Sequence, residues 1–195
     1  IEKDTFVIYM SDNGAFRHFS PLKGGKGSLW EGGIRVPFII KGPGIPKNTI
    51  NHSPIIGYDL FPTFMSIAGL NSYPEYLDGI NIIDTFDVLY KPSKRPNEGL
   101  IFHFPHYQRN QKPASSIIID NMKLIKHYGK ETDMLFDLSN DISEQNNLIN
   151  KKPKIYRSLL TKLERYLQSV DASMPLINPI YDTDSIMETE KKKKR

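Results

Sequence analysis

The feature that most constrains the fold is a short apolar run near the amino-terminal end that stops abruptly. Residues 5–10, Thr-Phe-Val-Ile-Tyr-Met, are mostly apolar and favour strands, and Ser11-Asp12-Asn13-Gly14 follows at once. Such a run is typical of a strand buried in a parallel sheet and ending at a turn. In open α/β sheets, ligands bind in the loops at the carboxyl ends of such strands. The sequence therefore predicts an α/β fold with a ligand-binding loop after Ser11.

Further elements of this first part follow from similar patterns. A second apolar run, Val36 to Ile40, closes at a Gly-Pro-Gly turn. Asp59 is placed to act as the N-cap of a helix with Pro62 in its first turn, and Gly69 is placed to end it. The apolar residues expected on this helix are Phe61, Phe64, Met65 and Ala68.

The carboxyl-terminal part predicts a small α+β subdomain. Short strand-like runs precede a helix that begins at Pro153, and Asp120-Asn121 suits a two-residue hairpin turn. Strands followed by one packing helix form such a subdomain. We expect the strands at 100–104, 116–119, 123–128 and 134–137, and the apolar face of the helix at Ile155, Leu159, Leu160, Leu163, Tyr166, Leu167 and Val170.

Proline-rich residues 71–98 predict an irregular connection with a boundary near Pro92 to Asn97. The expected division is therefore an α/β part over residues 1–97, the α+β subdomain over 98–180 and a flexible basic tail over 181–195.

Charge and composition exclude several classes of protein. The net charge is +4, but the five residues from Lys191 to Arg195 are all basic, and without them it becomes −1. The body therefore offers no basic groove for nucleic acid. The sequence has no cysteine, which excludes a disulfide scaffold, a thiolate zinc site and a cysteine nucleophile within these residues. It also has no apolar run of membrane-spanning length.

Two segments carry residues suited to binding chemistry. Asp12 and Asn13 offer oxygen ligands to a hard cation such as calcium, although Asp-Asn-Gly is also a common turn sequence. The glycine-rich loop around Lys26 can bring its backbone close to an anion while the ammonium supplies a positive charge. The loop lacks the P-loop spacing, and a surface loop with solvated lysines is an equal alternative. Trp30 and Pro37 favour a shaped loop, and we expect Lys23 to be solvated.

Together these residues resemble the sulfatase family, over almost the whole chain. The matching segments are 11–14, 24–37, 59–63, 68–69, 102–107, 123–125, 135–138 with Asp141, 144–148, and 174–175. The resemblance implies an alkaline-phosphatase-like fold, in which residues 1–97 end the catalytic domain and its large mixed sheet and the small subdomain has a four-stranded antiparallel sheet. It also implies that Asp12 and Asn13 bind Ca²⁺, and that Lys26 contacts the sulfate of a sulfated small molecule or glycan.

The resemblance also shows what these residues lack. Sulfatases attack with a formylglycine made in a Cys/Ser-x-Pro/Ala-x-Arg motif, which does not occur here. We therefore expect the chain to be the carboxyl-terminal portion of a longer sulfatase, inactive alone, whose preceding residues supply the nucleophile and further calcium ligands. The resemblance implies an exported location, periplasmic, secreted or lysosome-like. The rival hypothesis is a noncatalytic module that binds carbohydrate or anions.

Three histidines are candidate substrate contacts. His103 and His106 lie at the end of a predicted strand, where the resemblance places the mouth of the site and imidazoles can hydrogen-bond sugar hydroxyls. A pair of structural, partly buried histidines is the alternative. His18 lies on the loop that leads to Lys26 and can either contact substrate or be solvated.

Overall fold

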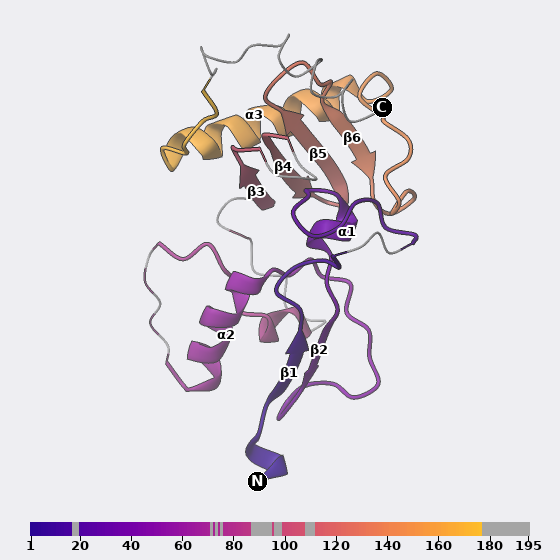
Figure 1. The fold of residues 1–195 in the computed structure, drawn as a ribbon. Coiled ribbons are helices and arrows are strands. Elements are labelled where there is room, and N and C mark those ends of the chain that lie inside the picture. The colour runs from indigo at the N-terminus through magenta and orange to yellow at the C-terminus, as the bar shows by residue number, and fades with distance from the viewer. Residues whose placement is uncertain are drawn as a thin grey trace, which may run out of the picture.

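The computed structural model shows a two-stranded unit joined to a four-stranded sheet with a long helix (Figure 1). It describes residues 1–16, 20–70, 72, 74, 76–86, 95, 99–107 and 112–176. The predicted tail, most of the predicted boundary and His18 lie outside these residues. No helix in the described ranges is long and apolar enough to cross a membrane.

The first apolar run forms a strand, but its partner is not the one expected. Strand β1, Val7–Met10, pairs with β2, Phe38–Lys41, and the pairing is antiparallel. Val7 and Tyr9 are 57% and 63% exposed. The expectation of a buried parallel strand is therefore wrong for this pair, because an apolar run shows which residues avoid water and not which strand lies beside them.

The predicted helix after Asp59 is present as α2, Leu60–Ile67, but Asp59 does not cap it with its side chain. The fully buried carboxylate instead accepts hydrogen bonds from the backbone N–H groups of Ile56 and Ile80, at 2.8 and 3.0 Å. Each of its two oxygens also accepts a hydrogen bond from the guanidinium of Arg95, at 2.8 and 2.6 Å. Asp59 therefore fixes three chain segments around the start of α2 and does not serve as the predicted cap.

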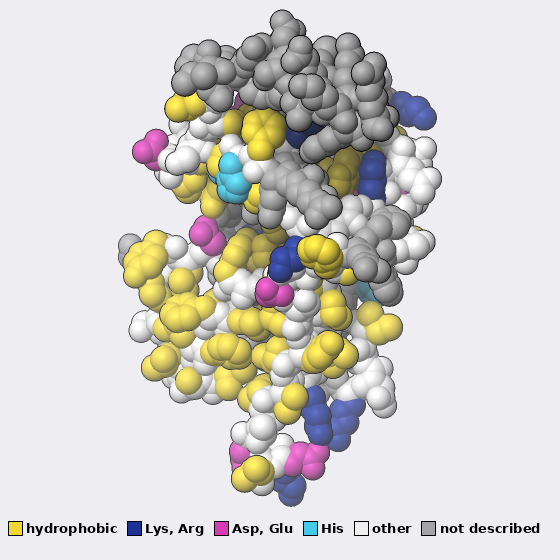
Figure 2. All heavy atoms as spheres, in the orientation of Figure 1, with side chains coloured by type: hydrophobic (Ala, Val, Ile, Leu, Met, Phe, Trp, Pro, Cys, Tyr) yellow, Lys and Arg dark blue, Asp and Glu magenta, His cyan; other side chains and the backbone are white. Residues whose placement is uncertain are grey.

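An apolar surface covers this half of the molecule. Figure 2 shows hydrophobic side chains gathered over α2 and the β1–β2 pair. Large exposed side chains there include Val7, Tyr9, Ile39, Phe61 and Phe64. A contiguous exposed apolar surface marks a face that packs against other protein.

The carboxyl-terminal subdomain has the predicted strands, hairpin and helix. Four antiparallel strands lie in the order β3-β4-β5-β6, and Asp120 and Asn121 join β4 to β5 with positive φ values of 47° and 63°. The elements are β3 (Leu100–Phe104), β4 (Ala114–Ile119), β5 (Met122–His127), β6 (Met134–Asp137) and α3 (Pro153–Ser169).

This sheet is covered on both faces, and the second cover positions the site. On one face, Ile117, Leu124 and Leu135 pack against Leu159, Leu163 and Leu167 of α3. On the other face, Ala114, Ile125 and Phe136 pack against Leu29, with Trp30 beside them. Alternate residues of a strand point to opposite faces, so one sheet supports two apolar layers. The glycine-rich segment around Lys26 is therefore attached to the second face of the subdomain.

Candidate active site

The end of β1 and the glycine-rich loop lie side by side and are joined through their backbones. The N–H of Lys26 donates to the carbonyl of Ala15 at 2.7 Å, and the N–H of Gly14 donates to that of Gly33 at 2.9 Å. Ala15 is two residues beyond Asn13. The structure thus brings together the two segments that carry the predicted metal ligands and the predicted sulfate contact.

Glycine is required at this junction because the two backbones approach too closely for a side chain. A Cβ on Gly14 would lie 1.9 Å from the carbonyl oxygen of Gly32. Gly24 has a φ of 75°, which is strained for any residue with a Cβ, and such an atom would also collide with Ser28 and Trp30. These glycines therefore permit a fixed contact between two segments.

The loop itself is closed by internal hydrogen bonds. At its base, the N–H of Gly32 donates to the carbonyl of Lys23 at 2.8 Å. Nearer its tip, the hydroxyl of Ser28 donates to the carbonyl of Gly25 at 2.8 Å. Helix α1, Glu31–Ile34, follows directly. This is the shaped loop that Trp30 and Pro37 favoured, and the exposed Lys26 lies between its ends.

The three predicted ligand-binding side chains have no partner within the described part of the chain. Asp12 and Lys26 are exposed and Asn13 is half-buried. Ser11 holds the turn, since its hydroxyl donates to the carbonyl of Asn13 at 2.8 Å. An aspartate and an asparagine held at a strand end fit calcium as oxygen donors. No group of three or more Asp, Glu, His or Cys side chains suited to a metal occurs among the described residues.

Lys23 is not the solvated lysine that we expected from sequence. Its ammonium lies 3.7 Å from the centroid of the Trp30 ring and donates to the carbonyl of Glu144 at 3.3 Å. A cation over an indole face is stabilised by the quadrupole of the ring. Lys23 is therefore part of the attachment of the loop, while Lys26 is the exposed lysine.

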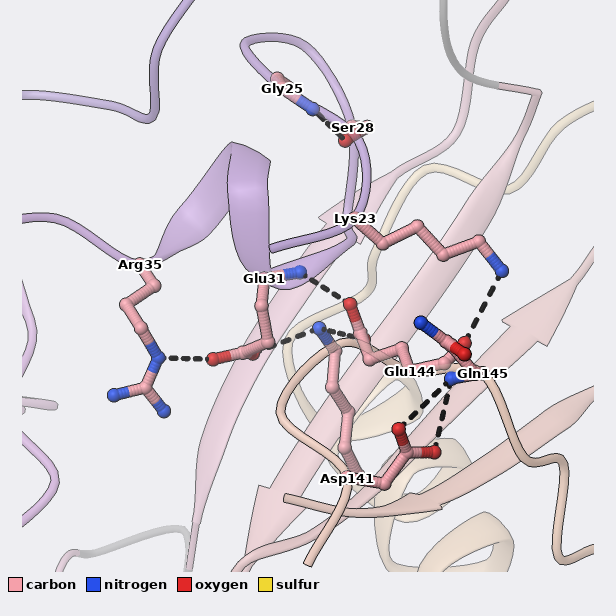
Figure 3. A network of polar contacts seen from close by, with 9 residues as sticks. Lys23, Gly25, Ser28, Glu31, Arg35, Asp141, Glu144 and Gln145 are labelled. Atoms are coloured by element: carbon pink, nitrogen blue, oxygen red, sulfur yellow. Dashed lines mark hydrogen bonds and ion pairs between the residues drawn. The ribbon is translucent and has the colours of Figure 1, made fainter. Parts of the chain in front are cut away.

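A buried charged cluster that sequence reasoning missed lies beneath the loop. Lys123 of β5 is fully buried, and its ammonium is 3.0 Å from Glu31 and 2.7 Å from Glu144, whose side chains are 2% and 0% exposed. The N–H of Glu31 also donates to the carboxylate of Glu144 at 2.7 Å (Figure 3). The other oxygen of Glu31 accepts from Arg35 at 2.6 Å. One lysine thus joins an acidic residue of the loop to an acidic residue of the subdomain.

The electrostatics of this cluster reflect its burial. Loss of solvation raises the pKa of Glu144, and the opposing attraction of Lys123 does not fully compensate. A buried carboxylate is tolerated where it is paired and hydrogen-bonded, as Glu144 is with Lys123 and the N–H of Glu31. Removing Lys123 would therefore leave the buried carboxylate of Glu144 without a cation.

The histidines fall into two groups. His103 lies on the α3 face of the sheet, opposite the face that carries Trp30, and its ring nitrogens meet the hydroxyl of Ser115 at 2.6 Å and the carbonyl of Ser173 at 2.8 Å. This geometry favours the structural alternative for His103. His106 is exposed, and its ring lies 4.1 Å from that of Phe104. Of these two histidines, His106 is the better placed for an external ligand.

Comparison with known proteins finds similar sequences and similar solved structures. A family model described as Sulfatase matches residues 1–70. The chain is 36% identical over 167 residues to a sulfatase of Formosa agariphila, covering 78% of this chain and 30% of that protein. It is 35% identical over 80 residues to an extracellular sulfatase SULF-1 homolog of Drosophila melanogaster, covering 41% of this chain and 7% of that protein. It matches the structure of Ps i-CgsB in complex with k-i-k-neocarrahexaose with a TM-score of 0.74 and 28% identity, covering 95% of this chain and 40% of that one.

The fold is thus of the alkaline-phosphatase-like α/β class that the sequence predicted, and in it a strand-end turn is hydrogen-bonded to a glycine-rich loop. The chain belongs to the sulfatase family, and the resemblance seen in the sequence is confirmed. It spans 30% of the length of the Formosa agariphila relative and 40% of the solved chain.

Proposed function

We propose that this chain is the carboxyl-terminal part of a calcium-dependent sulfatase that hydrolyses sulfate esters of carbohydrates. One observation supports the proposal: the backbone of Lys26, whose side chain is exposed, is hydrogen-bonded to Ala15, two residues beyond the Asp12-Asn13 turn. A cation and two oxygen donors without internal partners in the described chain suit an anionic substrate and a metal ion. The oligosaccharide in the related Ps i-CgsB structure supports a carbohydrate substrate.

The residues present divide the work of binding and charge stabilisation. Asp12 and Asn13 would hold Ca²⁺ together with ligands from residues outside this chain, and the ion would neutralise sulfate oxygens. Lys26 contacts the sulfuryl oxygens and stabilises the negative charge that moves toward the leaving oxygen. His106 hydrogen-bonds a sugar hydroxyl near the mouth of the site. A formylglycine outside these residues would supply the nucleophile.

Two features support a larger catalytic unit. The exposed apolar surface over α2 and β1–β2 has the character of a packing face. The related proteins are also much longer than the segment that matches. We propose that other parts of the enzyme cover this surface. The extracellular relative supports an exported location.

The test is a lysine substitution in the full-length enzyme. Lys26→Ala should lower kcat for a sulfated oligosaccharide and for an aryl sulfate by on the order of a hundredfold to a thousandfold, because one fixed electrostatic donor is lost. Lys47→Ala is the matched control, since Lys47 is an exposed loop lysine outside the site. An unchanged kcat for Lys26→Ala would overturn the assigned role. Binding of sulfated glycan without turnover by the unsubstituted protein would favour the noncatalytic module.

A further inference from the structure

We infer that Glu31, Lys123 and Glu144 form a positioning device, here called the Glu144 anchor, that holds Lys26 and the Asp12-Asn13 turn in catalytic register. The inference rests on the proposed function, because it concerns the placement of that site. None of the three residues is placed in contact with substrate. They act through the backbone of the loop.

Both ends of the loop are attached to Glu144. At the first end, the ammonium of Lys23 donates to the Glu144 carbonyl at 3.3 Å. At the second end, the N–H of Glu31 donates to the Glu144 carboxylate at 2.7 Å. Figure 3 shows these contacts converging on Glu144 from the two ends. Lys26 lies between them, so a shift at Glu144 moves both supports of the loop that carries it.

The attachment continues from the loop to the metal-ligand turn. Gly33 lies two residues after Glu31, and its carbonyl receives the N–H of Gly14 at 2.9 Å. Gly14 follows Asn13 directly. A displacement of Glu31 would therefore move Lys26 through the loop. It would also move the Asp12-Asn13 turn, through the hydrogen bond between Gly33 and Gly14.

The Glu144 end is itself rigidly held. Its φ of 53° places it in the left-handed region, so its position is set by the surrounding loop and not by local preference. The carboxylate of Asp141 accepts from the N–H groups of Gln145 and Asn146 at 3.0 and 2.8 Å. The side-chain oxygen of Asn147 accepts from the N–H of Leu135 in β6 at 3.0 Å. Glu144 is thus tied to the edge of the sheet.

The buried charges of this anchor select one geometry more strictly than an apolar contact would. Lys123 is fully buried between two carboxylates, an arrangement that is weak evidence for stability compared with apolar packing. Buried polar groups can instead select one arrangement, because any shift leaves a charge unpaired. Here the arrangement selected is the position of Glu31 above β5.

The test compares Glu144→Gln with Asp133→Asn in the full-length enzyme. Asp133 is a matched control: it is a buried carboxylate of the same subdomain, but it accepts from Tyr156 of α3 at 2.9 Å and makes no hydrogen bond to the loop within the described part of the chain. Glu144→Gln should increase hydrogen exchange of residues 22–34 at least about tenfold, with α3 unchanged. It should also lower kcat by about a hundredfold with a smaller change in KM, because misplacement by about 1 Å costs this much. Asp133→Asn should change neither loop exchange nor kcat.

The exchange measurement does not depend on turnover, so it separates failure of the anchor from failure of the proposed function. Unchanged exchange in residues 22–34, or equal acceleration throughout the subdomain, would overturn the inference. So would faster loop exchange with an unchanged kcat in an active enzyme. If Glu144→Gln does not fold, the charge-balanced double variant Lys123→Met/Glu144→Gln replaces it, and slow loop exchange with full kcat in that variant would likewise overturn the inference.

Discussion

Replacing Lys123 by Met tests the buried cluster as a source of stability as well as of position. Methionine has a similar length, so the substitution removes the charge without opening a large cavity. It leaves Glu144 with its hydrogen bond from Glu31 but without a cation, while Glu31 keeps Arg35. Breaking a buried ion pair by removing one partner costs about 3–5 kcal/mol. That is a large part of the roughly 5–15 kcal/mol by which domains are stable.

Lys126→Met is the matched control. Lys126 lies on the same strand, but on its opposite face, is 28% exposed and is 3.6 Å from Asp133. A partly exposed pair of this kind contributes up to about 1 kcal/mol. The two substitutions are chemically identical, so the difference between their losses in free energy of unfolding measures the effect of burial.

Urea denaturation of the purified chain at pH 7 measures both variants. With a slope of about 1–3 kcal/mol per M, a loss of about 3–5 kcal/mol should lower the Lys123→Met midpoint by about 1–5 M. Trp30 is the single tryptophan of the sequence and its ring lies 5.7 Å from that of Phe136, so its fluorescence reports the interface above the cluster. Equal midpoints for the two variants would refute the reasoning.

The pH dependence gives an independent check. Burial already raises the pKa of Glu144, and removal of Lys123 should raise it further. A carboxyl group whose folded-state pKa lies above its unfolded value contributes stability that is present below the unfolded pKa and is lost as pH rises through the folded pKa. The loss in free energy of unfolding caused by Lys123→Met should therefore be smaller near pH 4.5 and should grow toward neutral pH. A deficit that grows on acidification would contradict this sign.

The chain on its own should not turn over a chromogenic aryl sulfate and should bind Ca²⁺ only weakly, because Asp12 and Asn13 supply few of the roughly six to eight ligands that calcium takes; calorimetric titration showing micromolar affinity would contradict this. In the full-length enzyme, His106→Ala should raise KM for a sulfated oligosaccharide without changing the melting temperature. His103→Ala should lower the melting temperature and leave KM unchanged, since both ring nitrogens have internal partners; steady-state kinetics with scanning calorimetry would expose the reverse pattern.

The subdomain was predictable because its signals are local. Asp120 and Asn121 tolerate positive φ, and the apolar runs on either side of them pair directly as β4 and β5. Strands β3 and β6 have the predicted limits, Leu100–Phe104 and Met134–Asp137. Each strand of this sheet also pairs with the strand that is next to it in the sequence.

The pairing of β1 was not predictable in the same way. Val7 and Lys41 face each other across more than thirty residues of loop and helix, and no local pattern selects that partner. Asp59 shows the same limit, because its predicted capping role depended on neighbours in sequence. The carboxylate of Asp59 instead accepts hydrogen bonds from the backbone N–H of Ile80 and the guanidinium of Arg95, which only the tertiary fold brings close.

The buried cluster left a partial signal in the sequence. Lys123 and Ile125 are two residues apart in one strand, so they share a face, and Ile125 is a core residue. A lysine on the core face of a strand requires a carboxylate partner. The sequence could therefore have indicated that a partner exists, but Glu31 and Glu144 are distant in the chain and only the fold identifies them.

Lys23 and Lys26 show why residue type and spacing alone did not separate anchoring from binding. Both lysines lie in one glycine-rich segment, and by charge they are equivalent. Lys23 contacts Trp30 and the Glu144 carbonyl, so its ammonium is committed to holding the loop. Lys26 has its backbone bonded to Ala15 and its side chain exposed, so the loop is fixed while the ammonium remains available. The role proposed for Lys26 requires both properties, because a charge that must reorganise during the reaction stabilises the transition state less. The anchoring lysine thus gives the second lysine its fixed position.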